Sequence, residues 1–489
     1  MAIKLNNQAL KKLPANVSVP AYARSEITPG IVHIGVGNFH RAHQAVYMDK
    51  LFNLGIDYDW GIVGAGVKSY DEAMRNKLSQ QDWLSTVVEL DPKQDSARVC
   101  AAMIDFVEID AQLLIEQLCK SEIRIVSLTI TEGGYFRDER SGKFNAAHAE
   151  IIHDSQNPQA PKTVFGVLLA ALEKRRVGGV PPFTIMSCDN LPGNGHVTQQ
   201  AVLGLAQLIS EELAEWVRAE VCFPNGMVDC ITPATGERER VLVKESFDIE
   251  DASPVVCEAF RQWVLEDKFS QGRPALEKAG VQFVDDVAPY ELMKLRLLNG
   301  GHAALSYPAA LLGIEYVHDA MQNELVSGFM KKLIQQEVIP IVPAVEGMDF
   351  NLYFDKACER FANPKIADTI ARLCLDGSNR QPKFILPSIV DRLEQDLSVD
   401  GLALEVALWC RYCAGTDDAG NSIDVVDENV MRLQEQALLT RQQPEVFLSL
   451  ADILGPVAVD ETFIACFTTA IKSLWVDGVA ETLQRYNAD

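Results

Sequence analysis

Long apolar runs are missing from this sequence of 489 residues. A membrane-spanning helix needs roughly 18 or more consecutive apolar residues, and the best candidate, residues 164–172, is much shorter. The first residues, MAIKLNNQALKKL, also lack the apolar core of a secretory signal peptide. We therefore expect a soluble, cytoplasmic protein with no membrane partner.

Basic residues are scarce relative to acidic ones. The chain has 44 lysines and arginines against 68 aspartates and glutamates, a net charge of −24 with histidine neutral. An electrostatic field of that sign repels nucleic acid backbones and anionic lipid surfaces. We therefore expect no nucleic acid partner, and the charge itself carries no catalytic information.

The cysteines lack the spacing of a disulfide framework or a zinc site. There are eleven, an odd number, scattered along the chain, which is typical of free thiols in a reducing compartment. The one CxxC, at Cys410 and Cys413, lies in an apolar, helix-like segment without a second Cys or His pair at zinc spacing. We expect packing cysteines there and no bound metal.

The length favours two domains, and the sequence pattern changes near residue 286. Before it, apolar strand-like runs alternate with helical segments, which predicts a Rossmann-like, doubly wound α/β domain over residues 1–285. The expected strands are 31–37, 60–67, 123–130 and 183–188, the expected helices are 41–54 and 163–176, and residues 83–107 look β-rich enough to extend the sheet.

Helical periodicity dominates the rest of the chain, which predicts a mostly α-helical domain over residues 286–489. Its expected helices are 289–306, 321–337, 351–361, 367–375, 402–413 and 459–486, with turns at 376–382 and 415–421. No Pro/Gly/Ser linker separates the two domains, so we expect them to pack tightly with a site between them. Such a site comes from one chain, which suits a monomer or a weak homo-oligomer.

A glycine-containing turn follows the first predicted strand. In the segment 35–41, GVGNFHR, Gly35 and Gly37 match the first two glycines of a dinucleotide-binding fingerprint, and His40 stands in the place of the third. Glycine lets the backbone approach a pyrophosphate, and the following helix offers unpaired N–H groups. The alternative is an ordinary strand-to-helix turn. After the second strand, Asp71 favours NAD, whereas Lys68 could accept the 2′-phosphate of NADP.

A predicted helix over 289–302, PYELMKLRLLNGGH, carries four polar residues on one arc. With about 100° per residue, Glu291, Lys294, Asn299 and His302 share this arc, which also includes Leu298. Oxidation of an alcohol needs a base, which a lysine of lowered pKa can provide, and donors for the alkoxide, which asparagine can provide. The alternative is an amphipathic helix with a solvated lysine. A second polar cluster, SCDNLPGNGH (187–196), follows a predicted strand.

Together these segments resemble the mannitol dehydrogenase family of polyol-specific long-chain dehydrogenases, and the related hexuronate reductases, over nearly the whole chain. The resemblance rests on the segments 31–44, 125–135, 183–197, 257–269, 289–302 and 376–384. It implies a metal-independent enzyme that interconverts a polyol such as D-mannitol and its ketose with NAD, NADP remaining open. It further implies that Lys294 is the general base, that Asn190 and Asn299 hold the alkoxide, and that Glu291 assists proton release.

The resemblance also implies binding residues. The expected substrate contacts are His302, Asp229, Arg372 and Arg380, and the expected cofactor contacts are Gly35, Gly37, Asn38, Phe39, Arg41, Asp71, Thr131 and Glu132. Two positions depart from the family pattern. Gly301 replaces a common serine, which we expect to loosen the substrate helix, and Tyr70 replaces an acidic residue at the ribose site. The alternatives are a fructuronate or tagaturonate reductase and a nucleotide-linked sugar sensor without turnover.

Overall fold

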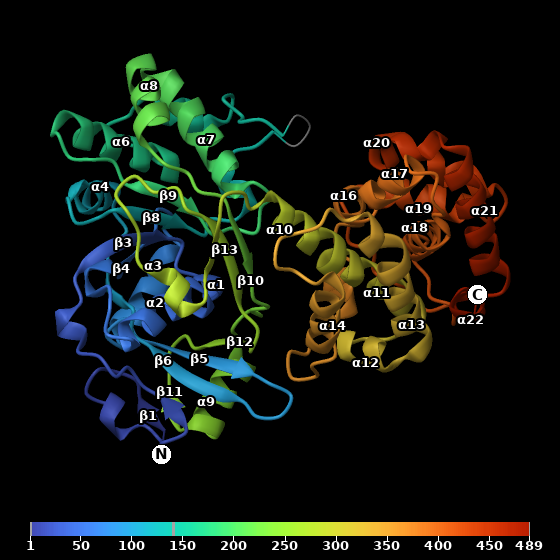
Figure 1. The fold of residues 1–489 in the computed structure, drawn as a ribbon, viewed down its shortest axis with the longest axis horizontal. Helices are drawn as coiled ribbons and strands as arrows, with labels where there is room; N and C mark the ends of the chain where they lie inside the picture. Colours follow the sequence, from blue (N-terminus) through green and yellow to red (C-terminus); the bar gives the residue numbers. More distant parts are fainter. Residues whose placement is uncertain (1, 139–141, 489) are drawn as a thin grey trace. The chain divides into compact units, whose positions relative to one another are not determined.

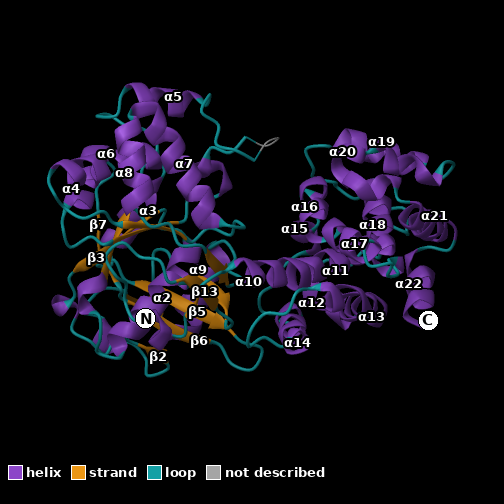
Figure 2. Cartoon of the chain, turned by 45° about the horizontal axis from the view of Figure 1, so that its top comes forward, coloured by secondary structure: helices purple, strands orange, loops and turns teal. Residues whose placement is uncertain are grey.

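A computed structural model describes residues 2–138 and 142–488 and divides the chain into two compact units. The first unit covers residues 1–288 and the second covers residues 289–489. In the described residues, every named strand belongs to the first unit, and the second unit is built from helices (Figure 1, Figure 2). This arrangement confirms the predicted fold class, a Rossmann-like domain followed by a mostly helical one.

A five-stranded parallel sheet forms the centre of the first unit. Its strands lie in the order β7 (Met103–Phe106), β4 (Gly61–Ala65), β3 (Pro29–Ile34), β8 (Ile125–Leu128) and β9 (Thr184–Ser187). From β3 the chain moves outward through β4 to β7, and it then returns to the other side of β3 with β8. The strand order therefore reverses between β3 and β8, and ligands bind doubly wound sheets at such a switch point.

The central sheet separates two hydrophobic cores. Successive side chains of a strand point to opposite faces, so Val32 and Ile34 of β3 enter one core and Ile31 enters the other. Figure 1 shows α4, α6, α7 and α8 together on one side of this sheet. The helices of the first unit are α1 (Asn38–Ala42), α2 (Gln44–Asn53), α3 (Asp71–Ser79), α4 (Ala111–Cys119), α5 (Ala149–Gln156), α6 (Val164–Val177), α7 (Asn194–Ile209), α8 (Glu211–Glu220) and α9 (Glu237–Phe247).

Three smaller sheets accompany the central one. They contain β12 (Val255–Glu258), β5 (Ser85–Leu90), β6 (Ser96–Cys100) and β2 (Val17–Ser18); β10 (Gly226–Asp229), β13 (Gln262–Glu266) and β14 (Gln282–Val284); and β1 (Ile3–Lys4) with β11 (Ile249–Glu250). Of the β-rich stretch 83–107, only β7 extends the central sheet, because β5 and β6 pair with each other and with strands from elsewhere in the chain.

The helix predicted over 41–54 is two helices, α1 and α2, which meet at His43. The backbone of His43 is outside the helical region, with φ −116° and ψ −90°. Its imidazole packs against the rings of Phe39 and Trp263, with ring centroids 4.9 and 5.3 Å away, and its Nε2 contacts the carbonyl oxygen of Gln262 at 2.9 Å. These tertiary contacts break a helix that local periodicity would continue.

Helices make up the second unit, which also contains two π-helical segments, Lys294–Asn299 and Ile334–Val338. Its α-helices are α10 (Ala288–Met293), α11 (Gly300–Leu311), α12 (Val317–Gln322), α13 (Glu324–Leu333), α14 (Phe350–Phe361), α15 (Ile370–Leu373), α16 (Gly377–Phe384), α17 (Leu386–Leu393), α18 (Asp400–Cys413), α19 (Val430–Leu439), α20 (Ala451–Leu454), α21 (Glu461–Val476) and α22 (Val479–Ala488). Helix α18 is buried from its second residue onward, and Cys410 and Cys413 pack inside this core.

The turn predicted over 376–382 and the continuous helix predicted over 459–486 were both wrong. Residues 376–382 form most of α16 instead of a turn, because Gly377 packs closely on Trp409 and Gln381 donates a 2.7 Å hydrogen bond to buried Glu405. The helix predicted over 459–486 is broken at Gly478, whose φ of +86° ends α21 before α22 begins.

No single helix among the described residues is long and apolar enough to cross a membrane. One bent pair of segments, Ala451–Val459 and Glu461–Val476, passes the same test by length and composition only.

Candidate functional site

The glycine turn lies at the carboxyl end of β3, beside the switch point of the sheet. Gly35 has a φ of +95°, and a Cβ there would overlap the carbonyl oxygen of Thr129. Gly37 has an ordinary φ of −98°, and a Cβ there would approach nothing closer than the Gly35 carbonyl oxygen, at 3.9 Å. The fold thus requires glycine at position 35, whereas at position 37 it leaves an open space beside the backbone.

Arg41 holds this turn from within the protein. Its side chain is fully buried, and burial lowers its pKa to about 10, opposed by the nearby Asp251 carboxylate. The guanidinium donates to the Gly37 carbonyl oxygen at 3.2 Å, to Asn38 Oδ1 at 2.8 Å and to the Ser253 carbonyl oxygen. The resemblance placed Arg41 among the cofactor contacts, and in the structure its guanidinium anchors the backbone of the turn.

A buried polar cluster supports the turn from the sheet side. The imidazole of His33 lies 2.8 Å from Ser127 Oγ and 2.9 Å from Thr129 Oγ1, and Thr129 donates a 2.6 Å bond to the Gly35 carbonyl oxygen. His40, at the third-glycine position, stacks on His33 with ring centroids 3.5 Å apart. Burial lowers the pKa of His33 to about 3 and that of His40 well below its ordinary value. Both imidazoles are therefore neutral near pH 7.

Asp71 lies at the start of α3, just after β4. Its Oδ2 accepts the backbone N–H groups of Val67 and Lys68, both at 3.0 Å, so part of its acceptor capacity orders its own loop. Lys68 forms a 2.7 Å ion pair with Glu150. The cation that sequence reasoning considered for a 2′-phosphate therefore already has a carboxylate partner.

The loops after β8 and β9 carry three more expected site residues. Thr131 and Glu132 are exposed in the first loop, and Asn190 is exposed in the second. Asn194 Nδ2 donates a 2.7 Å bond to the Gly226 carbonyl oxygen, which ties the second loop to β10, the strand that ends at Asp229. The first unit thus brings the expected cofactor turn and two of the polar loops to neighbouring strand ends.

In the second unit, Glu291, Lys294, Asn299 and His302 lie on one continuous helical run. Glu291 belongs to α10, Lys294 and Asn299 begin and end the π-helical segment, and His302 belongs to α11. Lys294 is 8% exposed. The predicted regular helix was wrong here: π turns close i→i+5 hydrogen bonds, so a fixed 100° step does not relate Lys294 to His302.

The π-helical segment is anchored by Arg296, which sequence reasoning did not select. Its guanidinium donates to Asp391 Oδ2 at 2.7 Å and to Ser388 Oγ, both on α17. Short π segments occur often at functional sites, but no sequence pattern marks this one in advance.

Aromatic side chains pack around the start of α11. The ring of His302 stacks on Phe361 with centroids 4.0 Å apart. Gly301 is buried, and a Cβ there would lie 3.3 Å from Phe354 and 3.5 Å from Phe361. The glycine at this position therefore belongs to a closely packed contact between α11 and α14.

The two basic residues expected at the substrate site lie next to each other in the second unit. Arg372, on α15, pairs with Asp368, with its Nε 2.5 Å from Oδ1. Arg380, on α16, donates to the carbonyl oxygens of Leu373 at 2.8 Å and Arg372 at 3.3 Å. Arg380 therefore holds the C-terminal end of α15, where the helix dipole favours a cation.

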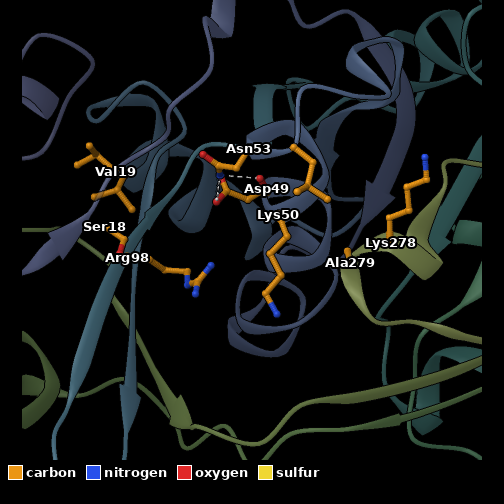
Figure 3. Close-up of a pocket in the computed structure, with 10 residues that line it drawn as sticks. Ser18, Val19, Asp49, Lys50, Asn53, Arg98, Lys278 and Ala279 are labelled. Atoms are coloured by element: carbon orange, nitrogen blue, oxygen red, sulfur yellow. Dashed lines mark hydrogen bonds between the residues drawn. The ribbon is translucent and has the colours of Figure 1, made fainter.

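A cavity of about 360 Å³ lies elsewhere in the first unit, and none of the expected site residues lines it. Figure 3 shows Lys50 and Arg98 reaching into this hollow, with Lys278 directed away from them. In the described part of the chain, no group of three or more His, Cys, Asp or Glu side chains is arranged to hold a metal ion.

The parallel sheet with a glycine turn at its switch point, followed by a helical unit, defines a two-domain protein of the dinucleotide-binding Rossmann class. Family models agree with this class and specify it. The mannitol dehydrogenase Rossmann domain matches residues 29–278, and the mannitol dehydrogenase C-terminal domain matches residues 286–475. The chain belongs to the mannitol dehydrogenase family, whose members are oxidoreductases.

Individual relatives cover almost the full length. A mannitol 2-dehydrogenase of Cereibacter sphaeroides is 53% identical over 97% of this chain and 99% of its own, and one from Aspergillus fumigatus is 41% identical over 99% of each. The solved ternary complex of Pseudomonas fluorescens mannitol 2-dehydrogenase with NAD and D-mannitol is 44% identical, covers 100% of both chains and has a TM-score of 0.86. A substrate-free D-sorbitol dehydrogenase is 35% identical, covers 98% of this chain and 100% of its own, and has a TM-score of 0.92.

Proposed function

We propose that this protein catalyses the NAD-dependent oxidation of D-mannitol to D-fructose, and the reverse reduction. The observation that carries the proposal is the 53% identity to a mannitol 2-dehydrogenase over 97% of the chain. The solved complex of a 44% identical relative with NAD and D-mannitol, which the chain matches over its whole length, supports the same reaction.

The glycine turn fits a dinucleotide. The open space beside Gly37 allows the backbone to approach a pyrophosphate, and Arg41 and Asn38 hold that backbone in place. Beside Asp71, the cation Lys68 is paired with Glu150, so its charge is partly neutralised before any 2′-phosphate binds, and we propose NAD over NADP. NAD, when bound, accepts the hydride released from the carbinol carbon.

Lys294 acts as the general base in this proposal. Lys294 is largely buried, and a lysine can serve as a general base where its surroundings match its pKa to the working pH. Lys294 takes the proton of the substrate hydroxyl, and Glu291, one turn earlier, assists its release to solvent. Asn190 and Asn299 donate to the developing alkoxide, and no metal is required.

The remaining polar residues recognise the other hydroxyl groups of the polyol. We assign this role to His302, Asp229, Arg372 and Arg380. The stack on Phe361 fixes the plane of the His302 imidazole. Bonds to Asp368 and to the end of α15 orient the two guanidinium groups, so less rotamer freedom is lost when substrate binds.

The first experiment follows cofactor absorbance with NADH or NADPH and a panel of fructose, xylulose, fructuronate and tagaturonate, with EDTA throughout. Oxidation of NADH with fructose supports the proposal, and oxidation only with the uronates would replace it with hexuronate reduction. If no substrate causes oxidation of the cofactor although NADH binds tightly, a sugar sensor without turnover is favoured.

D-Sorbitol is a second candidate substrate, because a D-sorbitol dehydrogenase matches this chain with a TM-score of 0.92. Mannitol and sorbitol both give fructose on oxidation at C2, so consumption of fructose cannot separate them. The product of fructose reduction must therefore be identified by chromatography, and NAD reduction must be compared with D-mannitol and D-sorbitol. If sorbitol is the main product of fructose reduction, the proposed substrate changes from D-mannitol to its C2 epimer, D-sorbitol.

A further inference from the structure

Asp189 lies between the loops that follow β8 and β9, and sequence reasoning gave it no role. Its Oδ1 accepts the backbone N–H of Thr131 at 3.0 Å, and its Oδ2 accepts that of Ile130 at 2.9 Å. The hydroxyl of Tyr135 donates to Oδ2 at 2.6 Å. Burial raises the pKa of the Asp189 carboxyl group above its ordinary value, and these three donors oppose part of that rise.

A closed hydrogen-bond circuit fixes the Asp189 side chain. Ser187 Oγ lies 2.6 Å from the Tyr135 hydroxyl and accepts the backbone N–H of Asp189 at 3.3 Å. Ser187 and Tyr135 are both buried. Since each member of the circuit orients the next, these bonds hold the carboxyl group in the observed arrangement.

The backbone of Thr131 needs this support. Its φ is 61° and its ψ is 166°, a conformation that residues other than glycine rarely adopt. Such strain persists only where the surrounding structure imposes it, and Asp189 supplies the bond to the Thr131 N–H. Without that bond we expect Thr131 to relax to a negative φ, which would move Glu132 with it.

The loop that carries Asp189 is fixed on its other side as well. Asn194 Nδ2 donates to the Asp189 carbonyl oxygen at 3.0 Å and to the Gly226 carbonyl oxygen of β10 at 2.7 Å. Asn190 lies directly after Asp189 in this loop. The side chain of Asp189 therefore ties the Thr131 loop to the segment that presents Asn190.

We propose that Asp189 is a positioning residue for hydride transfer, which sets the cofactor loop at Thr131 and Glu132 in register with the alkoxide-binding amide of Asn190. The role rests on the proposed function, since it takes Thr131 and Glu132 as cofactor contacts and Asn190 as a substrate contact. Asp189 itself touches neither ligand and acts through its two loops.

The test compares Asp189→Asn with Asp154→Asn in the full-length protein. Asp154 is a matched control, because its buried carboxylate also accepts two backbone N–H groups, of Lys162 and Thr163, and one hydroxyl group, of Thr163. Asp154 orders the loop between α5 and α6, and its partners His153, Lys162 and Thr163 are not expected site residues. An asparagine keeps one acceptor oxygen at either position and places an NH₂ group against a former donor.

For each variant, NADH affinity is measured by fluorescence titration, kcat and KM by fructose reduction, and Tm by thermal unfolding. We expect Asp189→Asn to lower kcat by about tenfold to a hundredfold, as small misplacements of reacting groups do, and to weaken NADH binding. Asp154→Asn should lower Tm by about as much as Asp189→Asn does, while its kcat and NADH affinity stay within about twofold of the wild-type values. Equal effects of the two variants on kcat and NADH affinity would overturn the proposal.

A rescue separates positioning from general damage. Glycine adopts a positive φ without support, so Thr131→Gly in the Asp189→Asn background should recover part of the NADH affinity that Asp189→Asn alone loses. A double variant that binds NADH no more tightly than Asp189→Asn alone would contradict the proposal. If the wild-type protein reduces no substrate at all, the proposed function fails, whereas the NADH titrations of the same four proteins still decide whether Asp189 positions the Thr131 loop.

Discussion

Two alanine substitutions in the glycine turn separate what the fold requires from what the cofactor requires. At Gly35, a methyl group would overlap the carbonyl oxygen of Thr129, and the φ of +95° disfavours any residue with a Cβ. At Gly37, the backbone is ordinary and the nearest atom would be 3.9 Å away. Gly35→Ala should therefore damage the protein itself, and Gly37→Ala should damage only the binding of a ligand that uses the open space.

The magnitudes follow from this geometry. Left-handed backbone costs an alanine about 1–2 kcal/mol, and the overlap with a backbone atom adds to it. We expect Gly35→Ala to lower the free energy of unfolding by at least ~2 kcal/mol, whereas Gly37→Ala should stay within about 0.5 kcal/mol of the wild type. A methyl group that displaces a bound pyrophosphate should weaken NADH binding by at least about tenfold, or 1.4 kcal/mol.

Thermal unfolding without cofactor measures the first effect, and a fluorescence titration with NADH measures the second. The expected pattern is a lowered Tm for Gly35→Ala, and for Gly37→Ala an unchanged Tm with weakened NADH binding. Wild-type NADH affinity in Gly37→Ala would refute the assignment of this turn to the pyrophosphate. An unchanged Tm in Gly35→Ala would refute the steric argument.

Three further predictions concern stability, packing and cofactor choice. Burial raises the pKa of Glu405 to about 8, so the contribution of its protonated form to stability is present below pH 4.5 and is lost as the pH rises through 8. Between pH 6 and 9 the wild type should therefore lose about 2.5 kcal/mol of unfolding free energy that Glu405→Gln keeps. Unfolding measured at each pH tests this difference. Gly301→Ser should crowd Phe354, lower Tm by the equivalent of about 1 kcal/mol and raise KM for polyol more than it lowers kcat; an unchanged Tm would contradict the packing argument. Glu150→Gln should release Lys68 and strengthen NADPH binding relative to NADH by several-fold, and an unchanged ratio of the two Kd values would show that Lys68 does not face the ribose.

Local signals in the sequence predicted much of the first unit. The apolar run before Gly35 predicted β3, and the glycines after it predicted a turn at a strand end, since both depend on residues close together in the chain. The break at His43 was not predictable, because the contact of His43 with Trp263 joins residues far apart in sequence. The failure at α16 has the same origin, since a helix that contains Pro382 depends on the core around it.

For the candidate site, the sequence predicted the candidate catalytic residues but not the backbone geometry or the supporting residues around them. Resemblance to a known family selected Lys294 and its neighbours, but helical periodicity could not reveal the π turn between Lys294 and Asn299. The supporting residues were missed for a physical reason. Asp189 and Arg296 act through bonds to other parts of the fold, and a lone charged residue in a sequence gives no sign of such partners.

Whether Lys294 is the general base is decided by mannitol oxidation with Lys294→Ala across pH, with a substitution at an exposed lysine, Lys356→Ala, as the control. We expect Lys294→Ala to lower kcat by about a hundredfold or more and to leave NADH affinity unchanged. Added methylamine should restore part of the rate, and Lys356→Ala should behave as the wild type. A Lys294→Ala protein that oxidises mannitol at a near-normal rate at neutral pH would show that Lys294 is not the general base.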